Sequence, residues 1–450
     1  PHSSYLDPRS FRHMRARQEG SFFGVGIIIS RRNGEITVIS PIAGTPAAAR
    51  GLRAGDVISG VAGESTEELS LDEVVDLVRG PEGSVVVLSI SRPGFKEPFD
   101  VEIERTRIPQ TSVRFSFLIE PDIGYVRLSE FSNTSTREVQ DAIRNLTDQG
   151  MTRLIFDLRN NPGGPLDAAV GVSDLFLEKG QLITSTRGRT PENNTVFDAP
   201  GNPNGFDGPL VILVNQGSAS ASEIVAGAVQ DHDRGLVLGD ATWGKGLVQT
   251  VFTVRDTGLA LTTARYYTPS GRCIQRDYES FIDYVTYRNG NAETTTEIFE
   301  TDAGRTVMGG GGITPDIVVE NRTLSESMVR LFSVSAFFRF GVEVLADVPE
   351  EKYAEFAAGF DVDEEILDRF WSWVVEEEIL DPGIIESLQE DPVESADVTR
   401  AIKSEVYNST LGLNQGYQVA LEGDDQMEAA IENFDTAAEF WEAFQQEHNE

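Results

Sequence analysis

Residues 107 to about 322 alternate strand-like apolar runs with amphipathic helical runs, and this alternation limits the fold more than any other feature. The run "GPLVILVNQG" (208–217) is apolar on both faces, which is typical of a central strand in a parallel sheet. "STREVQDAIRNLTDQG" (135–150) carries apolar residues at helical spacing. The alternation predicts a layered α/β domain over 107–325. Further strands are expected near 235–238, 247–254 and 258–267.

A different pattern precedes this domain. Residues 1–20 are polar and predict an N-terminal helical segment, whereas 21–106 consist of short β-rich runs separated by turns. Within them, "SLDEVVDLVRG" (70–80) predicts a helix, because Ser70 and Glu73 form a capping-box pattern and a glycine ends the run. These features predict a small β-barrel-like module with two helices.

The acidic charge is concentrated in the last quarter of the chain. The whole sequence has 37 basic and 73 acidic residues, a net charge of −36. Residues 331–450 contain 30 acidic and five basic residues, a net charge of −25, with aromatic residues at helical spacing. This segment predicts a separate all-α extension over 326–450. The overall charge argues against nucleic acid or an anionic membrane as a partner.

Composition excludes several other classes. The single cysteine, Cys273, excludes an intrachain disulfide and a cysteine-based metal site, and the four histidines form no metal-binding pattern. The longest apolar runs are far shorter than the ~20 residues that a membrane span needs. The chain opens "PHSSYLDPRS" without Met or an apolar signal region, so any export signal is expected to lie outside this sequence.

Three closely spaced serines form the first candidate site. "NQGSASASEIVAGAV" (215–229) places Ser218, Ser220 and Ser222 between a buried strand and a helix. A serine at such a turn is exposed at the carboxyl edge of the sheet, and the helix N-terminus offers N–H groups to an oxyanion. The alternative is that one of the serines only caps the helix, and the pattern alone favours this alternative.

A nucleophilic serine needs a base. His232 is the only histidine in this domain, but it lies twelve residues along the helix from Ser220, which is ~18 Å, so we expect it to be solvated at the helix end. "ATWGKGLVQT" (241–250) offers Lys245, between two glycines and beside apolar residues. Burial lowers the pKa of a lysine, and a neutral lysine can accept the serine proton. Gln249 is placed to orient its amine.

The same stretch also matches the start of a phosphate-binding loop. "GDATWGK" (239–245) fits GxxxxGK, but Gly246 stands where Ser or Thr would bind Mg²⁺. The residues that follow are β-like, whereas the lysine of a phosphate-binding loop opens a helix. Nucleotide binding is therefore not expected.

Several motifs, in order, resemble those of the carboxyl-terminal processing peptidases, which are Ser/Lys proteases of family S41 with an embedded PDZ domain. The motifs are "GYVRLSEF", "DLRNNPGG", "GSASASE", "WGKG", "YYTPSGRCIQ" and "GGGGITPDI". The resemblance covers roughly residues 1–325 and implies a crotonase-like α/β core over 107–325 with a PDZ domain over 21–106. Departures are small: Trp243 replaces a more usual Phe, Pro162 replaces Gly, and Cys273 replaces Ser.

The resemblance implies roles for individual residues of the core. It makes Ser220 the nucleophile, Lys245 the general base and Gln249 the residue that orients the amine. It assigns the oxyanion-binding N–H groups to Gly164 and Ala221. No metal or cofactor is implied.

In the PDZ domain, the resemblance implies a loop that binds a C-terminal carboxylate. Successive backbone N–H groups would form this nest, and the edge of the next strand would hold an extended peptide. The loop residues are Gly24, Val25, Gly26 and Ile27.

The resemblance further implies protein or peptide substrates with a free C-terminus, a homodimer and a location in the bacterial cell envelope. The same core is compatible with two other functions. The same core can serve a non-catalytic peptide- or ligand-binding protein, but such a protein has no need of Ser220, Lys245 and Gln249 together. An acyl-CoA enzyme is disfavoured by the acidic charge and by the same residues.

Overall fold

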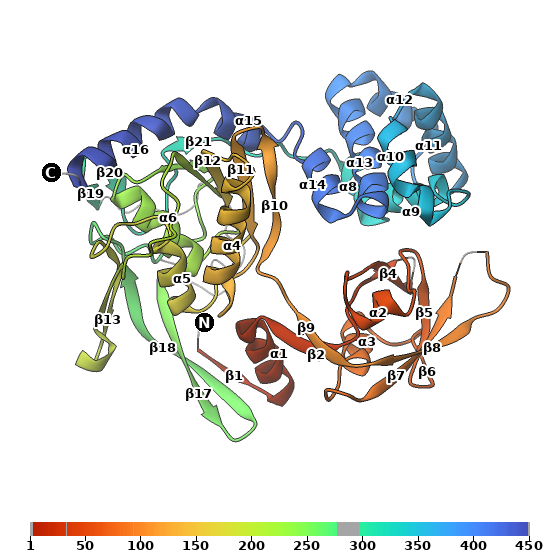
Figure 1. Cartoon of the computed structure of the whole chain (residues 1–450), viewed down its shortest axis with the longest axis horizontal. Helices are drawn as coiled ribbons and strands as arrows, with labels where there is room; N and C mark the ends of the chain where they lie inside the picture. Colours follow the sequence, from red (N-terminus) through yellow and green to blue (C-terminus); the bar gives the residue numbers. More distant parts are fainter. Residues whose placement is uncertain (1–2, 33, 93, 277–296, 449–450) are drawn as a thin grey trace. The chain divides into compact units, whose positions relative to one another are not determined.

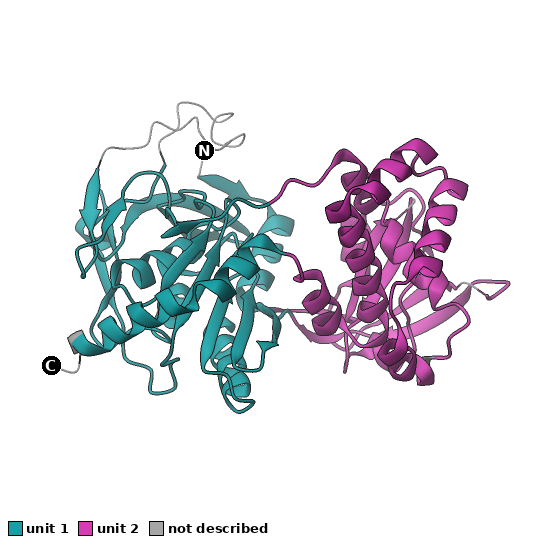
Figure 2. Ribbon diagram, turned by 90° about the horizontal axis from the view of Figure 1, so that it is seen from above, with its two compact units in different colours: residues 1–20, 110–321, 424–450 teal, residues 21–109, 322–423 magenta. Residues whose placement is uncertain are grey.

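The computed structural model describes residues 3–32, 34–92, 94–276 and 297–448. The chain divides into two compact units (Figure 2). The first unit contains residues 1–20, 110–321 and 424–450. The second unit contains residues 21–109 and 322–423. Each unit is therefore assembled from segments that are distant in the sequence.

A six-stranded sheet forms the centre of the first unit. Its order is β10-β11-β12-β15-β16-β21, and all neighbouring pairs are parallel except β10 with β11. Every residue of β15 is buried, as expected for a central strand. The predicted layered α/β domain is thereby confirmed. The strands are β10 (Val113–Glu120), β11 (Ile123–Leu128), β12 (Arg153–Asp157), β15 (Leu210–Val214), β16 (Leu236–Gly239) and β21 (Ile317–Val318).

Three helices accompany this sheet: α4 (Ser135–Thr147), α5 (Leu166–Ser173) and α6 (Ala221–Asp231). Helix α4 is amphipathic and packs on β10 and β11. Helix α6 is buried along its whole length and packs against α5 and β16. The turn before α6 is thus attached to a helix that is buried along its whole length.

A second sheet of the first unit lies beside the first one (Figure 1). Strands β17 and β18 form a long antiparallel hairpin, and β18 also pairs with β13 and β1. The strands predicted near 247–254 and 258–267 are confirmed. The elements of this region are β1 (Ser4–Leu6), α1 (Pro8–Glu19), β13 (Leu182–Gly188), a 3₁₀ turn (Pro191–Asn193), β14 (Thr195–Asp198), β17 (Leu247–Val254), β18 (Thr257–Tyr267), β19 (Ile298–Glu300) and β20 (Thr306–Met308).

The last two helices, α15 (Asp425–Glu432) and α16 (Phe434–His448), belong to the first unit. Helix α16 packs on β15 and β16, and Figure 1 shows it lying along the core. The Trp441 indole and the Gln445 amide both donate to Asp207 at 3.0 Å. Helix α16 therefore packs on the α/β core by polar as well as apolar contacts.

The second unit begins with a small β-domain. Its sheet has the order β3-β4-β5-β7-β8, so β3 is an edge strand, and helices α2 and α3 pack on it. The predicted capping box at Ser70 and Glu73 is present in α3. The elements are β2 (Ser21–Gly24), β3 (Ile27–Arg32), β4 (Glu35–Pro41), α2 (Pro46–Ala49), β5 (Val57–Val61), β6 (Glu64–Ser65), α3 (Leu71–Val78), β7 (Val85–Ser91), β8 (Phe99–Glu104) and β9 (Thr106–Pro109).

The rest of the second unit is helical. Its core is built around stacked aromatic rings, such as Phe337 on Phe370 at 5.4 Å between ring centroids. The guanidinium of Arg32, at the end of β3, lies 3.9 Å from the ring centroid of Phe338, which joins the β-domain to these helices. The helices are α8 (Glu326–Ser333), α9 (Ala336–Val344), α10 (Tyr353–Gly359), α11 (Glu364–Glu376), α12 (Pro382–Glu390), α13 (Pro392–Thr410) and α14 (Leu413–Ala420).

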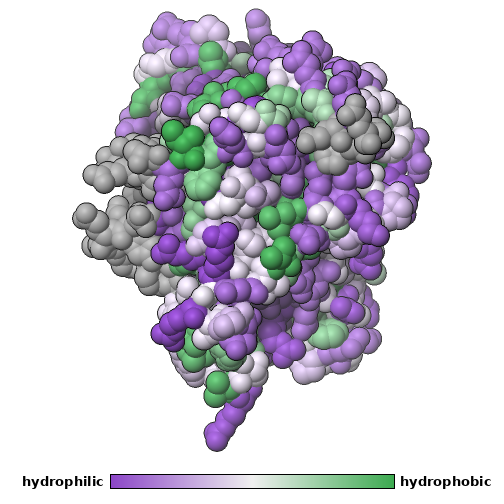
Figure 3. Space-filling view, turned by 90° about the vertical axis from the view of Figure 1, so that its left-hand side faces the viewer, coloured by the Kyte–Doolittle hydropathy of each residue, from purple (hydrophilic) through white to green (hydrophobic). Residues whose placement is uncertain are grey.

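The all-α character predicted for the C-terminal region is confirmed, and its residues fall in both units: 322–423 in the second and 424–450 in the first. The proposed domain boundaries at 20/21, 106/107 and 325/326 stay predictions. On the face shown in Figure 3, hydrophilic residues predominate and hydrophobic ones gather in small groups. No helix among the described residues has the length and apolar character to cross a membrane.

Candidate active site

Ser220 lies at the turn between β15 and α6, immediately before the first helical residue. Its backbone has φ 58° and ψ −111°, a conformation that residues other than glycine rarely adopt. Such local strain persists only where the surrounding structure fixes the backbone, and it is frequent at functional sites. A strand–turn–helix of this kind presents the serine hydroxyl at the edge of the sheet.

The three serines of this turn have different environments. The Ser218 hydroxyl donates to the Leu158 carbonyl at 2.8 Å, and the Ser222 hydroxyl donates to the Asn161 carbonyl at 2.9 Å. Both hydroxyls therefore fasten the turn to the loop that follows β12. The Ser220 side chain instead lies near the Tyr266 phenol, whose pKa it lowers. The geometry thus gives Ser218 and Ser222 structural roles and sets Ser220 apart.

The loop after β12 lies directly against the Ser220 turn. Gly163 has φ 92°, and a Cβ placed on it would lie 2.8 Å from the Ala221 nitrogen and 2.8 Å from Ser220 Cβ. Only glycine fits this close approach. The Asn161 side chain accepts from Gly163 N at 2.9 Å and donates to the Leu128 carbonyl at 2.7 Å. The peptide that joins Gly163 to Gly164 is therefore held beside the first N–H of α6.

Glu223 is the residue that joins the two halves of the site, and sequence reasoning gave it no role. It is fully buried, and its Oε2 accepts from Ser220 N at 2.7 Å and from Lys245 N at 2.9 Å. Its Oε1 accepts from Gly244 N at 2.7 Å and from the Thr242 hydroxyl at 2.6 Å. Burial raises the pKa of Glu223, whereas these four hydrogen bonds oppose the rise. One carboxylate therefore sets the spacing between the serine turn and the lysine loop.

Lys245 stands between the glycines of "WGKG", and β17 begins two residues later at Leu247. The lysine does not open a helix, as expected from the argument against a phosphate-binding loop. Burial lowers the pKa of the Lys245 amine, and the negative charge of Glu223 opposes this effect. A lysine in this environment has a larger neutral fraction than one in water, which suits it to accept a proton.

Tyr266 on β18 is a second site residue without a predicted role. Its backbone N–H donates to the Gly246 carbonyl at 2.8 Å, so β18 runs beside the lysine loop. Burial raises the pKa of the Tyr266 phenol, and the nearby Ser220 side chain opposes this rise. Tyr266 belongs to the motif "YYTPSGRCIQ", but the sequence does not indicate that it lies near Ser220.

Gln249 and His232 are two further positions that the sequence singled out. Gln249 is on β17 opposite Thr262, and its side chain is exposed. The prediction that His232 is solvated is wrong: it is buried, and its ring nitrogens lie 2.6 Å from Asp302 Oδ2 and 2.8 Å from the Leu182 carbonyl oxygen. Because Asp302 lies seventy residues further along the chain, the sequence around His232 did not reveal this partner.

In the second unit, hydrogen bonds hold the backbone of the predicted carboxylate-binding loop. Gly26 has φ 83°, and its carbonyl accepts from Ile42 N at 3.0 Å and from the Thr45 hydroxyl at 3.0 Å. The Val25 carbonyl accepts from Ala47 N at 2.9 Å. The Val25 and Gly26 carbonyls are thus hydrogen-bonded within the domain. The chain continues from Gly24 through Ile27 into β3, an edge strand of the sheet.

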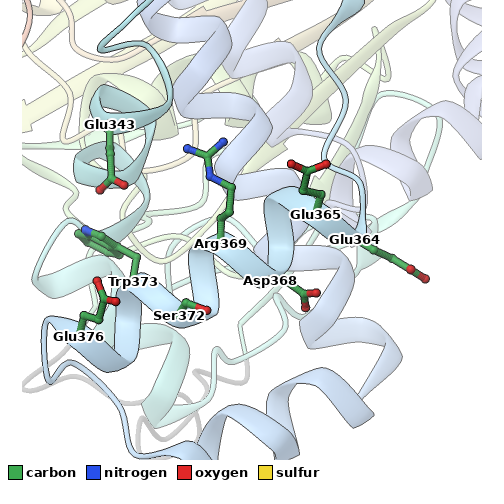
Figure 4. Close-up of a pocket in the computed structure, with 8 residues that line it drawn as sticks. All are labelled: Glu343, Glu364, Glu365, Asp368, Arg369, Ser372, Trp373 and Glu376. Atoms are coloured by element: carbon green, nitrogen blue, oxygen red, sulfur yellow. The ribbon is translucent and has the colours of Figure 1, made fainter.

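Figure 4 shows a pocket of about 530 Å³ in the helical part of the second unit. Its walls are mostly acidic and contain none of the predicted site residues. They are formed by Glu343, Glu364, Glu365, Asp368, Arg369, Ser372, Trp373 and Glu376. Within the part of the chain that the structure describes, no group of His, Cys, Asp and Glu is arranged to hold a metal ion.

The α/β core, the strained serine joined to the half-buried lysine through Glu223, and the separate β-domain agree with the expected core and PDZ domain. The sequence model of Peptidase family S41 matches residues 122–280, and a PDZ-domain model matches residues 37–92. Residues 122–280 thus belong to peptidase family S41, and the expected resemblance is confirmed.

Named relatives agree with this assignment. A carboxy-terminal-processing protease of Bartonella bacilliformis is 44% identical over 281 residues, which cover 61% of this chain and 64% of that protein. A carboxyl-terminal-processing protease of Synechocystis sp. is 38% identical over 283 residues, covering 61% and 65%. The chain thus spans less than two thirds of the length of either relative.

Two solved structures are also similar. The photosystem II D1 C-terminal processing protease is 31% identical, with 71% of this chain and 78% of that chain covered and a TM-score of 0.38. The PDZ domain of a carboxy-terminal protease from Vibrio cholerae, solved in complex with peptide, is 35% identical, with 20% and 97% covered and a TM-score of 0.19.

Proposed function

We propose that this protein is a serine endopeptidase that cleaves proteins near their C-terminus with a Ser220/Lys245 dyad. The observation that carries the proposal is the Glu223 carboxylate, which binds the backbone N–H groups of both Ser220 and Lys245. A carboxylate buried between these two residues fixes the nucleophile relative to the base. The family membership and the names of the relatives support the same reaction class.

In the proposed mechanism, neutral Lys245 takes the hydroxyl proton as Ser220 Oγ attacks the scissile carbonyl carbon. The N–H groups of Gly164 and Ala221 stabilise the tetrahedral oxyanion. Lys245 then donates the proton to the leaving amine, and water hydrolyses the acyl-enzyme with Lys245 again acting as base. Gln249 orients the amine. The close approach of Gly163 to Ala221 supports the pairing of the two oxyanion donors.

The lysine base predicts a definite pH dependence. Activity requires neutral Lys245, so kcat/KM should rise with pH through an apparent pKa below 10.5, the ordinary lysine value, because burial lowers this pKa. The measurement is kcat/KM for one peptide from about pH 6 to pH 10. A profile that falls as the pH rises over this range would contradict lysine as the base.

Substrates are proposed to be recognised by their free C-terminus. The N–H groups of the loop Gly24, Val25, Gly26 and Ile27 would bind the carboxylate, and the edge of β3 would pair with the extended peptide. The shaped loop and the edge position of β3 support this, as does the peptide in the related Vibrio cholerae PDZ structure.

We also propose that the protein acts in the bacterial cell envelope and as a homodimer. The location is supported by the bacterial carboxy-terminal processing relatives. The dimer rests on the family resemblance alone.

The test compares one unstructured protein that ends in apolar residues, prepared with a free C-terminal carboxylate and with a C-terminal amide. The free form should be cleaved with a kcat/KM at least about 10-fold higher, because the amide removes the charge that the loop binds. Equal cleavage of both forms would contradict recognition by the loop. If neither form is cut and a serine-directed probe does not label Ser220, the peptidase proposal itself fails.

A further inference from the structure

Arg159 stands where strand β12 passes into the loop that approaches Ser220. It follows the end of the strand by two residues and is 5% exposed. Its backbone N–H donates to Asp157 Oδ1 at 2.8 Å. The next residue, Asn160, has φ 58°, and its N–H donates to Asn215 Oδ1 at 2.8 Å. The path of the loop toward Gly163 is therefore set at Arg159.

On the sheet side, Arg159 binds the fully buried carboxylate of Asp157. Its Nη2 lies 2.9 Å and its Nε 3.1 Å from Asp157 Oδ2. The same carboxylate accepts from the Tyr125 hydroxyl at 2.6 Å and has the Arg127 guanidinium at 3.6 Å. Asp157 is thus shared between two arginines.

On the other side, Arg159 is held by residues more than 260 positions later. Its Nη1 donates to both carboxylate oxygens of Asp424, at 2.9 Å and 2.8 Å, and to Gln426 Oε1 at 3.1 Å. Gln426 is fully buried, and its amide donates to the Val319 carbonyl at 2.7 Å. Asp424 also caps helix α15 by accepting from the N–H groups of Gln426 and Met427.

The charges of this group balance. Arg127 and Arg159 carry two positive charges, and Asp157 and Asp424 carry two negative ones. Removing Asp424 leaves an excess positive charge at a nearly dry position, where an unpaired charge is costly. Arg159 would then shift toward water or toward Asp157, and the loop that begins at Arg159 would shift with it.

We propose that Asp424 and Gln426 are positioning residues of the peptidase site, which hold Arg159 and through it the Gly163–Gly164 turn against Ala221. This inference rests on the proposed function, in which that turn supplies an oxyanion donor. It gives residues 424–426, at the start of helix α15, a part in catalysis that acts through Arg159.

The experiment uses the full chain with Asp424→Asn, which removes the ion pair and keeps a side-chain oxygen able to cap α15. Hydrogen exchange measured by mass spectrometry should be at least about 10-fold faster in the segment 159–164. For a cleaved peptide, kcat should fall about 10- to 100-fold while KM stays within about 2-fold, because only the oxyanion donors are displaced. Asp425→Asn, an exposed neighbour with the same change in charge, should alter neither quantity.

Unchanged exchange in 159–164 for Asp424→Asn would overturn the inference. If Asp424→Asn does not fold, Gln426→Met replaces it; this variant removes the contacts to Arg159 and Val319 at similar volume and should shift exchange and kcat in the same direction. If the wild type cleaves nothing, the proposed function fails. The exchange measurement still decides whether these residues position the loop.

Discussion

Replacing Ser220 or Lys245 with alanine should lower kcat for peptide cleavage by about 10³-fold or more, since each change removes one member of a unit that acts together. The double variant should be hardly slower than either single one, because the remaining residue has nothing to act with. Ser220→Ala should fold normally, since the Ser220 backbone is held by Glu223 rather than by its own hydroxyl.

The matched controls for this result are Ser218→Ala and Ser222→Ala, two positions away on either side. Their hydroxyls bond to the Leu158 and Asn161 carbonyls, so their loss should destabilise the fold by about 1 to 3 kcal/mol and lower kcat by at most about 10-fold. A Ser220→Ala variant that retains activity, or a Ser222→Ala variant that loses it entirely, would contradict the assignment of the nucleophile.

Glu223→Gln should be nearly as damaging, although the Glu223 side chain is fully buried. A glutamine amide has one oxygen, so it cannot accept from Ser220 N, Gly244 N, Lys245 N and the Thr242 hydroxyl together. The unsatisfied N–H groups should cost about 2 to 5 kcal/mol of unfolding free energy. The loosened spacing between serine and lysine should lower kcat about 100-fold.

Denaturant unfolding and steady-state kinetics of Glu223→Gln test this expectation, and Glu428→Gln, an exposed residue of α15, serves as the control for the change in charge. A Glu223→Gln protein with normal kcat would show that the carboxylate is only a helix cap. If the variant is less stable but keeps a normal kcat at a temperature where it is folded, the carboxylate likewise has only a structural role.

The sequence allowed the α/β core to be predicted well, because its signals are local. The apolar run 210–214 is buried on both faces, and the small residues before α6 leave room for the strained turn at Ser220. Lys245 was recognisable because burial of a lysine among glycines and apolar residues is unusual. In each case, neighbouring residues determine the feature.

Features that depend on distant partners were missed. The pattern Ser220-x-x-Glu223 indicates only a helix start, and nothing in it shows that Glu223 also accepts from residues 242–245. The composition likewise does not indicate that the chain passes from the second unit to the first at residue 424, because acidic residues occur on both sides of it. The contact of Asp424 with Arg159, across 265 residues of sequence, lies at this boundary.

The chain leaves the first unit twice, after residues 20 and 321, and each time it returns close to the point where it left. Gln110 N donates to the Gly20 carbonyl at 2.9 Å, and the Gln426 side chain donates to the Val319 carbonyl at 2.7 Å. Residues 21–109 and 322–423 are therefore insertions whose ends are neighbours in the peptidase core. Closing each gap with a short linker carries only a small entropic cost. The first unit can accordingly be described as one core with two insertions. The ends of residues 21–109 and of residues 322–423 are the positions at which we expect these segments to be exchanged or removed most easily.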